Sequence, residues 1–126
     1  MIVRTLDEIT DTERDVRGEG WRAKRLLVRD DGLGYSLSET TVDGGAEMNL
    51  WYKHHNEACF VIEGEAEITE RDTGAVHRIR PGSAYSPQQD RHAIRVISTL
   101  RLVCVFNPAL TGREKHDSDG SYLPAP

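Results

Sequence analysis

Turn-forming residues recur at short intervals along the chain, and this punctuation is the strongest constraint on its fold. Each turn combines glycine with an acidic residue or proline, at residues 31–34, 43–45, 63–64, 72–74 and 81–82. Closely spaced turns of this composition separate short strands and leave little room for helices of ordinary length. The sequence therefore predicts an all-β fold with about eight or nine strands.

The segments between these turns are either alternating or continuously apolar, as the strands of a small barrel are. The expected strands include residues 25–28, 35–42, 58–62, 66–69, 93–97 and 100–106. One short helix is expected over residues 5–14, because Thr5 and Glu8 have the spacing of a capping box. From residue 107 the apolar pattern stops, and composition alone favours a disordered tail.

The chain has 126 residues, of which 37% are hydrophobic, and this is enough for one compact domain over residues 1–126. A net charge of −5 and the lack of a basic block argue against nucleic acid and membrane as partners, and leave small molecules. Acidic residues stand near the N-terminus where a signal peptide is apolar, so we expect a cytoplasmic protein. In that compartment Cys59 and Cys104 are expected to be reduced thiols.

Three histidines can be placed by their positions along the expected strands. His54 and His55 are adjacent, and adjacent residues of a strand point to opposite sides of the sheet. At most one of them can therefore face an interior cavity, and His55 shares the parity of Glu57. His77 lies in a polar segment and is expected at the surface.

One stretch in the middle of the chain resembles the first motif of the cupin family, whose members are small double-stranded β-barrels. Its glycine and glutamate spacing matches that motif, which runs here through Gly45, Trp51, Lys53, Glu57 and Gly64. In the family two histidines stand at the positions of Trp51 and Lys53. The glutamate of the motif, which binds a metal in cupins, is retained as Glu57.

A second stretch resembles the second cupin motif. It leads from Pro81 and Gly82 through Tyr85 and Pro87 to His92, with Gln89 where the motif usually has glycine. His92 matches the metal-binding histidine of that motif. Residues on neighbouring antiparallel strands can converge inside a barrel although they are distant in sequence. Glu57, Tyr85 and His92 are therefore candidate metal ligands, and their hard to borderline donors suit Fe(II) or Zn(II).

Several further stretches resemble the ectoine synthase family within the cupins. The resemblance extends from residue 1 to about residue 122 and is most specific in the tail. It rests on Tyr52-Lys53-His54-His55, Glu57-Ala58, Val61-Ile62-Glu63-Gly64-Glu65, Cys104-Val105-Phe106-Asn107-Pro108-Ala109-Leu110-Thr111-Gly112-Arg113-Glu114, His116-Asp117 and Asp119-Gly120. Against the disorder that composition favours, it implies that residues 107–126 form a lid over the barrel.

The resemblance implies a hydro-lyase that makes the compatible solute ectoine. The α-amine of N-γ-acetyl-L-2,4-diaminobutyrate attacks the acetamide carbonyl of the same molecule, and water leaves. A divalent metal, Fe(II) above others, on Glu57, Tyr85 and His92 would polarise the carbonyl, and no organic cofactor is implied. The family also implies a homodimer.

The same resemblance implies roles for residues around the metal. Glu114, His116 and Tyr52 are the expected catalytic residues, with the first two as proton carriers. Among the substrate-binding residues, Arg25 with Thr40 would hold the substrate carboxylate. The others are the apolar walls Trp21 and Phe106, the cavity residue Cys104 and the polar contact Ser38.

Two other classes of function compete with this one. A non-catalytic cupin that binds a small ligand would share the fold. Such a protein has no need of three metal ligands together with the two titratable lid residues Glu114 and His116. A cupin isomerase or dioxygenase would normally have the two histidines that Trp51 and Lys53 replace.

Overall fold

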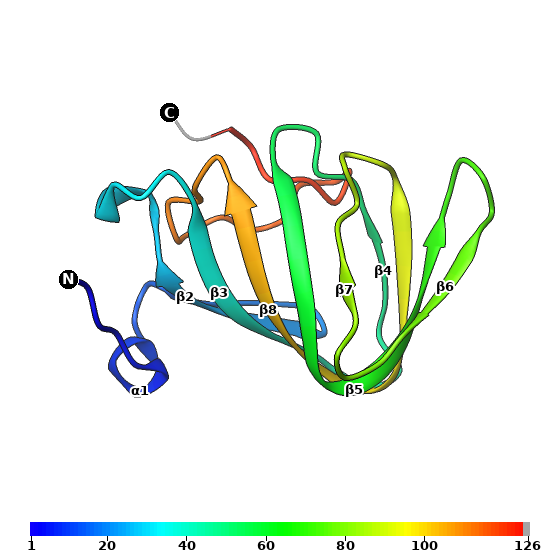
Figure 1. Ribbon diagram of the computed structural model, residues 1–126, viewed down its shortest axis with the longest axis horizontal. Coiled ribbons are helices and arrows are strands. Elements are labelled where there is room, and N and C mark those ends of the chain that lie inside the picture. Colours follow the sequence, from blue (N-terminus) through cyan, green and yellow to red (C-terminus); the bar gives the residue numbers. More distant parts are fainter. Residues whose placement is uncertain (125–126) are drawn as a thin grey trace.

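The computed structural model describes residues 1–124 of the chain and places eight strands in one antiparallel sheet (Figure 1). The strands are β1 Asp15–Gly18, β2 Trp21–Leu27, β3 Ser36–Val42, β4 Glu47–Leu50, β5 Asn56–Glu70, β6 Val76–Ile79, β7 Ala84–Tyr85 and β8 His92–Asn107. A helix, α1, spans Leu6–Ile9, and a 3-10 turn, η1, spans Arg29–Asp31. The predicted all-β fold with one short N-terminal helix is confirmed.

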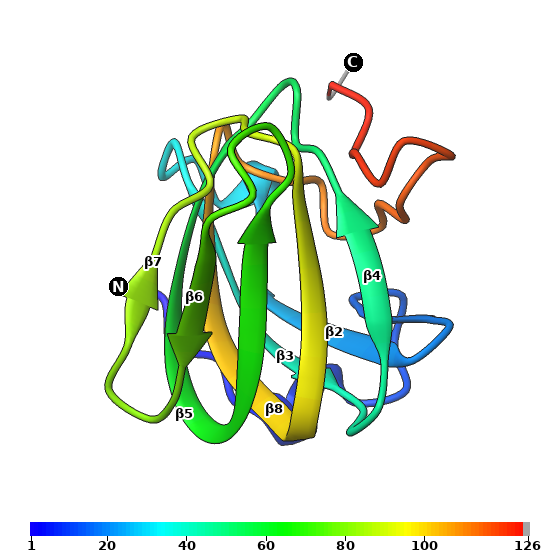
Figure 2. The same ribbon diagram turned by 90° about the vertical axis from the view of Figure 1, so that its right-hand side faces the viewer.

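The two longest strands, β5 and β8, bend and contribute to two facing layers (Figure 1). Their halves nearest Glu57 and Phe106 extend a layer that contains β1, β2, β3 and β7. Their other halves pair with β6 and β4, and Figure 2 shows these strands in front of β2 and β3. Apolar side chains of both layers meet between them and form the core.

The bend of β5 falls at Gly64, where the pairing with β8 shifts register. Gly64 has a φ of +82°, and a Cβ atom on it would lie 2.1 Å from the carbonyl oxygen of Thr99. Only glycine fits a left-handed conformation so close to another backbone. The glycine that predicted a turn at residues 63–64 is therefore a bulge inside one continuous strand. In consequence the expected strands 58–62 and 66–69 are both parts of β5.

The helix predicted over residues 5–14 is wrong in length, because α1 ends at Ile9. Its beginning is as expected, since the Thr5 side chain accepts a hydrogen bond of 3.3 Å from the backbone N–H of Glu8. From Asp15 the chain instead forms β1, which pairs with β2. The guanidinium of Arg22 donates two hydrogen bonds, of 2.7 and 2.5 Å, to the Asp15 carboxylate. This hairpin, whose second strand is also paired with β3, outweighs the weak helix signal.

The C-terminal segment is ordered through residue 124, so the disorder favoured by its composition is wrong. Leu110 is buried, and its backbone N–H donates to the Ser36 hydroxyl at 2.9 Å. Further along, the backbone N–H of Trp51 donates to the carbonyl oxygen of Gly120 at 2.9 Å, and Tyr122 is buried in the core. The segment lies across one end of the barrel, beside β4 (Figure 2). Within residues 1–124, no helix has the length and apolar character needed to span a membrane.

Candidate active site

A cavity of about 50 Å³ lies between the two layers, below the C-terminal segment. Most of the predicted site residues line it, namely Trp21, Arg25, Ser38, Thr40, Tyr52, Glu57, Tyr85, Cys104, Phe106 and His116. Two others lie outside this lining. Glu114 does not line the cavity but has a carboxylate oxygen 4.0 Å from Nη1 of Arg25, which does. His92 lines a neighbouring pocket, and Tyr85 lines both that pocket and the cavity.

The strand register explains how residues far apart in sequence reach one place. Arg25 is opposite Ser38, Ser38 is opposite Cys104, Cys104 is opposite Cys59, and Cys59 is opposite Tyr85. Directly opposed residues of antiparallel strands project to the same face of the sheet. The five side chains therefore form one row across the inner face, which ends in a cation at one side and a phenol at the other.

Arg25 is a buried cation with unused hydrogen-bonding capacity. Only 1% of the residue is exposed, and its Nη2 donates to the Tyr122 hydroxyl at 3.2 Å. Its Nε and Nη1 atoms have no hydrogen-bond partner, although Nη1 lies 4.0 Å from a carboxylate oxygen of Glu114. Buried polar groups are normally satisfied, and a charged one costs more when it is not. This cation is therefore suited to an anionic ligand in the cavity.

Glu114 is fixed by hydrogen bonds from the turn that precedes it. Its carboxylate accepts from the Thr111 N–H at 2.7 Å, from the Thr111 hydroxyl at 2.8 Å and from the Gly112 N–H at 3.0 Å. Burial alone would raise the pKa of Glu114, but these donors outweigh it and lower that pKa. The carboxylate is thus held ionised, close to the Arg25 guanidinium.

His116 is enclosed by aromatic side chains of the barrel and the C-terminal segment. Its ring stacks on Tyr122 with centroids 4.5 Å apart and meets Trp21 edge-on at 5.1 Å. Burial, and after it the positive charge of Arg25, lowers the pKa of His116 to about 4. Its Nε2 lies 2.8 Å from the Tyr52 hydroxyl, which donates to it when that nitrogen is unprotonated. Neutral imidazole and phenol therefore form a pair that can pass a proton.

Glu57 and Tyr85 supply two oxygen donors on the floor of the cavity. Burial raises the pKa of Glu57 to about 7, although the thiols of Cys59 and Cys104 hydrogen-bond to this carboxyl group. Burial also raises the pKa of Tyr85 well above its ordinary value. Groups that are costly to ionise without a partner are well placed to receive a cation.

His92 presents a free nitrogen in a buried position. Its Nδ1 lies 3.0 Å from the carbonyl oxygen of Asp90, which can only accept, so Nδ1 carries the proton. Its Nε2 is buried without a hydrogen-bond partner. A backbone carbonyl on one ring nitrogen and a lone pair on the other is the usual arrangement of a metal-binding histidine. The donor types of Glu57, Tyr85 and His92 suit a divalent metal, with His92 in the pocket next to the cavity that the other two line.

The other histidines have the predicted exposure, but His54 and His55 lie in the bend before β5, which begins at Asn56, and not in a strand. His55 is 1% exposed and lies edge-on to Phe106, with ring centroids 5.9 Å apart, whereas His54 is exposed. His77 is exposed, with its Nε2 2.6 Å from a carboxylate oxygen of Glu70. In the loop before His92, Gln89 occupies the position where the second motif usually has glycine. Its φ of +65° is a left-handed conformation that favours glycine, which explains why glycine is usual there.

Tyr122 is the main cavity-lining residue that the sequence did not indicate. It contacts both Arg25 and His116 and lines the cavity. It lies among polar and turn-forming residues near the end of the chain, where no periodic pattern predicts burial. Leu110, which also lines the cavity, was missed for the same reason.

Gly120 lies where the C-terminal segment contacts the barrel, against the backbone of Asn49. The variant Gly120→Ala therefore tests whether docking of this segment is needed for activity. The added Cβ would lie 2.1 Å from the Asn49 carbonyl oxygen, and Gly120 has a φ of +71°. Left-handed backbone costs a non-glycine residue about 1–2 kcal/mol, so docking should weaken by about 5–30-fold. Hydrogen exchange of residues 116–122 should rise accordingly, and turnover should fall.

Gly74→Ala is the matched control for this variant. Gly74 has a similar φ of +78° but nothing within 4 Å of its added Cβ, and it lies in the β5–β6 turn. Gly74→Ala should have the same free-energy cost of a left-handed backbone, but it should not change hydrogen exchange in the C-terminal segment. Equal effects of both variants on that segment would contradict the assignment.

The fold of the chain is that of a small cupin. An RmlC-like cupin from Shewanella frigidimarina has the same fold, with a TM-score of 0.60 at 20% identity over 75% of this chain and 82% of that one. The sequence model of the ectoine synthase family matches residues 1–126, and the chain belongs to this family.

Relatives along the whole chain agree with this membership. The L-ectoine synthase of Mycolicibacterium vanbaalenii is 50% identical over 123 residues, which are 97% of this chain and 95% of that protein. That of Saccharopolyspora erythraea is 49% identical over 97% of this chain and 91% of its own length. The crystal structure of ectoine synthase from P. lautus matches with a TM-score of 0.88 and 45% identity, over 100% of this chain and 92% of that one. The chain is thus an enzyme, as its sequence predicted.

Proposed function

We propose that the protein is a hydro-lyase that closes N-γ-acetyl-L-2,4-diaminobutyrate to ectoine with loss of water. The observation that carries this proposal is the buried guanidinium of Arg25, which has two nitrogen atoms without a hydrogen-bond partner. It stands at one end of the row of five opposed side chains on the inner face of the sheet, and Tyr85 stands at the other end. A substrate carboxylate bound at Arg25 would extend its acetamide towards Glu57 and Tyr85. The names of the relatives favour this reaction over simple ligand binding.

Substrate binding falls to residues of β2, β3 and β8. In the proposal, Arg25 and Thr40 hold the carboxylate, and Ser38 makes a polar contact beside them. Trp21 and Phe106 are apolar walls, and Cys104 fills the space between the strands; all of these line the cavity. Walls that fold the flexible substrate bring its amine within reach of its own carbonyl.

Proton transfer falls to Tyr52 and His116. An ammonium group must lose two protons as it becomes a nitrogen of the protonated amidine, and the departing oxygen must gain two to leave as water. The neutral Nε2 of His116 takes a proton through the Tyr52 hydroxyl and returns it to that oxygen. Glu114 is already saturated with donors, so its proposed role is to keep its negative charge beside Arg25 and the substrate ammonium.

Glu57, Tyr85 and His92 are the residues that would hold a divalent metal, which we propose to be Fe(II). When bound, such an ion supplies Lewis-acid polarisation of the amide carbonyl. The fit rests on the buried, unpartnered Nε2 of His92 and on the buried oxygens of the other two side chains. No organic cofactor belongs to the proposal.

Two further proposals concern the state of the protein in the cell. Phe60 and Ile62 expose apolar side chains on β5, which supports a homodimer formed through this strand. The two free cysteines support a cytoplasmic location. Sedimentation of the purified protein tests the dimer directly.

The test of the function is a direct assay. Protein purified without a metal-binding tag is loaded anaerobically with Fe(II), and ectoine is measured by chromatography, with a chelated sample alongside. The expected result is turnover that disappears on chelation and returns when Fe(II) is added back. Saturable substrate binding without product would favour the non-catalytic cupin instead.

A further inference from the structure

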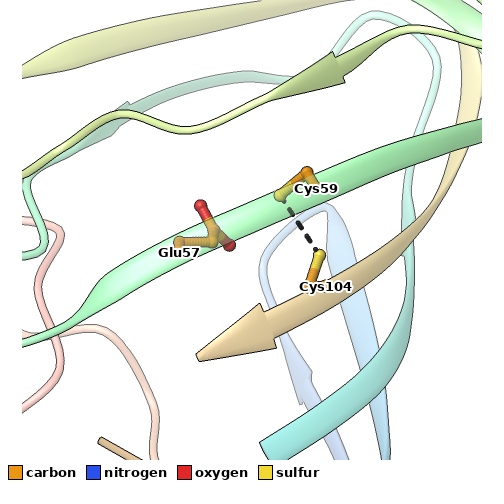
Figure 3. A group of neighbouring side chains, drawn as sticks. All are labelled: Glu57, Cys59 and Cys104. Carbon is orange, nitrogen blue, oxygen red and sulfur yellow. Dashed lines mark hydrogen bonds between the residues drawn. The ribbon is translucent and has the colours of Figure 1, made fainter. Parts of the chain in front are cut away.

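We propose that Glu57, Cys59 and Cys104, with Tyr85 beside them, form a binding site for a thiophilic divalent ion such as Zn(II). This ligand set differs from the one with His92, and it does not depend on the proposed reaction. One carboxylate oxygen and the two sulfurs all lie within 4.8 Å of one another, and all three residues are buried. Figure 3 shows the sulfurs facing each other across β5 and β8, with the Glu57 carboxylate next to them.

The separation of the sulfurs fits ligation of one ion. The two Sγ atoms are 3.5 Å apart, without a disulfide bond between them. Two thiolates in a tetrahedral zinc site, with Zn–S bonds of about 2.3 Å, lie about 3.8 Å apart. A small adjustment of the side chains therefore suffices, and the backbone register that opposes Cys59 and Cys104 need not change.

A fourth donor is present on the neighbouring strand. Tyr85 lies opposite Cys59 in the pairing of β7 with β5, so the two side chains project to the same face of the sheet. The Glu57 carboxylate has an oxygen within 4.8 Å of both sulfurs. The four groups thus gather around one point, and an ion at that point would replace the contact between the two thiols. Two sulfurs and two oxygens suit a borderline or soft ion better than Mg(II) or Ca(II).

The two ligand sets overlap at Glu57 and Tyr85. A carboxylate or phenolate shared by two ions binds each of them more weakly, and two divalent cations that close together repel each other, so occupancy of one set disfavours occupancy of the other. Thiophilic ions are therefore expected to compete with the ion held through His92. The outcome of that competition is set by Cys59 and Cys104, which the proposed reaction does not use as ligands.

Cobalt(II) is the probe for this site, because its spectrum reports both sulfur ligation and geometry. Apoprotein kept reduced with a phosphine is titrated with Co(II), and the thiolate-to-cobalt charge-transfer band in the near ultraviolet is recorded. The wild-type protein and His92→Ala should both give the band. Cys59→Ala and Cys104→Ala should each lose about half of its intensity, and the double variant should lose all of it.

A second measurement needs no substitution and guards against variants that fail to fold. The ¹¹³Cd chemical shift of the cadmium-loaded wild-type protein reports how many sulfurs bind the ion. A shift typical of two sulfurs supports the site, and a shift typical of oxygen and nitrogen alone overturns it. Bound Co(II) without a sulfur band, in a protein that makes ectoine, would likewise refute the thiol site and leave the proposed function intact. A sulfur band in the cobalt-loaded protein, together with no turnover in a separate sample loaded with Fe(II) alone, would support the thiol site and contradict the proposed function.

Discussion

Replacing His92 with alanine is expected to remove both Fe(II) binding and turnover while leaving the fold intact. The side chain offers a buried Nε2 lone pair that makes no hydrogen bond in the described structure, so its loss breaks no contact at that atom. Lewis-acid stabilisation is worth several kcal/mol, and a loss of about 4 kcal/mol lowers the rate about 10³-fold. Metal content and kcat should therefore fall together.

Thermal unfolding supplies a readout of this variant that is independent of activity. An ion at 100 times its Kd stabilises the wild-type protein by about 2.7 kcal/mol, and His92→Ala should show almost none of this increase. His77→Ala is the matched control, because His77 is exposed and paired with Glu70. If His92→Ala kept its metal and its activity, His92 would not be a ligand.

Replacing Arg25 with alanine is expected to lower kcat/KM by about 100-fold or more. Hydrogen bonds to charged groups are worth about 1.5–3 kcal/mol, and Arg25 has two buried nitrogen atoms free to make them. Arg25→Lys should recover little, because a lysine offers a point charge without the planar fork of donors. Steady-state kinetics of both variants with the acetylated substrate measure the effect.

A substrate analogue separates binding of the carboxylate from a general disturbance of the site. N-acetyl-1,3-diaminopropane lacks only the carboxylate, so the wild-type protein and Arg25→Ala should bind it about equally. Lys24→Ala, on the opposite face of β2, is the matched control and should behave as the wild type. If Arg25→Ala lost binding of substrate and analogue to the same extent, its role would lie in holding Glu114 and the C-terminal segment.

Much of the candidate site could be predicted because two kinds of signal agree. The prediction that His55 is buried and His54 exposed is confirmed, although both residues precede β5 and the strand on which the prediction relied begins only at Asn56. The motif spacing placed Glu57 and Tyr85 at one cavity. It did not indicate that Cys59 lies opposite Cys104, because register between strands 45 residues apart in sequence is set by the whole sheet.

Both errors arise because the pattern of a segment does not report which strand it pairs with or which surface it is buried against. The segment after Ile9 has some helical character, but pairing of β1 with β2 and the bonds between Asp15 and Arg22 decide its conformation. Likewise the tail has a disordered composition, yet burial of Leu110 and Tyr122 against the barrel orders it.

The sequence by itself determined the all-β class, the family and most of the side chains that reach the cavity. The all-β class follows from turn residues and from the two-residue period of strands, which are local properties of the chain. The family and the cavity side chains follow from the resemblance of its motifs to those of ectoine synthases. Only the tertiary structure decided that Arg25 is an unsatisfied buried cation, that Glu114 is saturated with donors and that two thiols adjoin Glu57. Burial, pKa and hydrogen-bond satisfaction depend on atoms brought together from distant strands, and no stretch of sequence contains them.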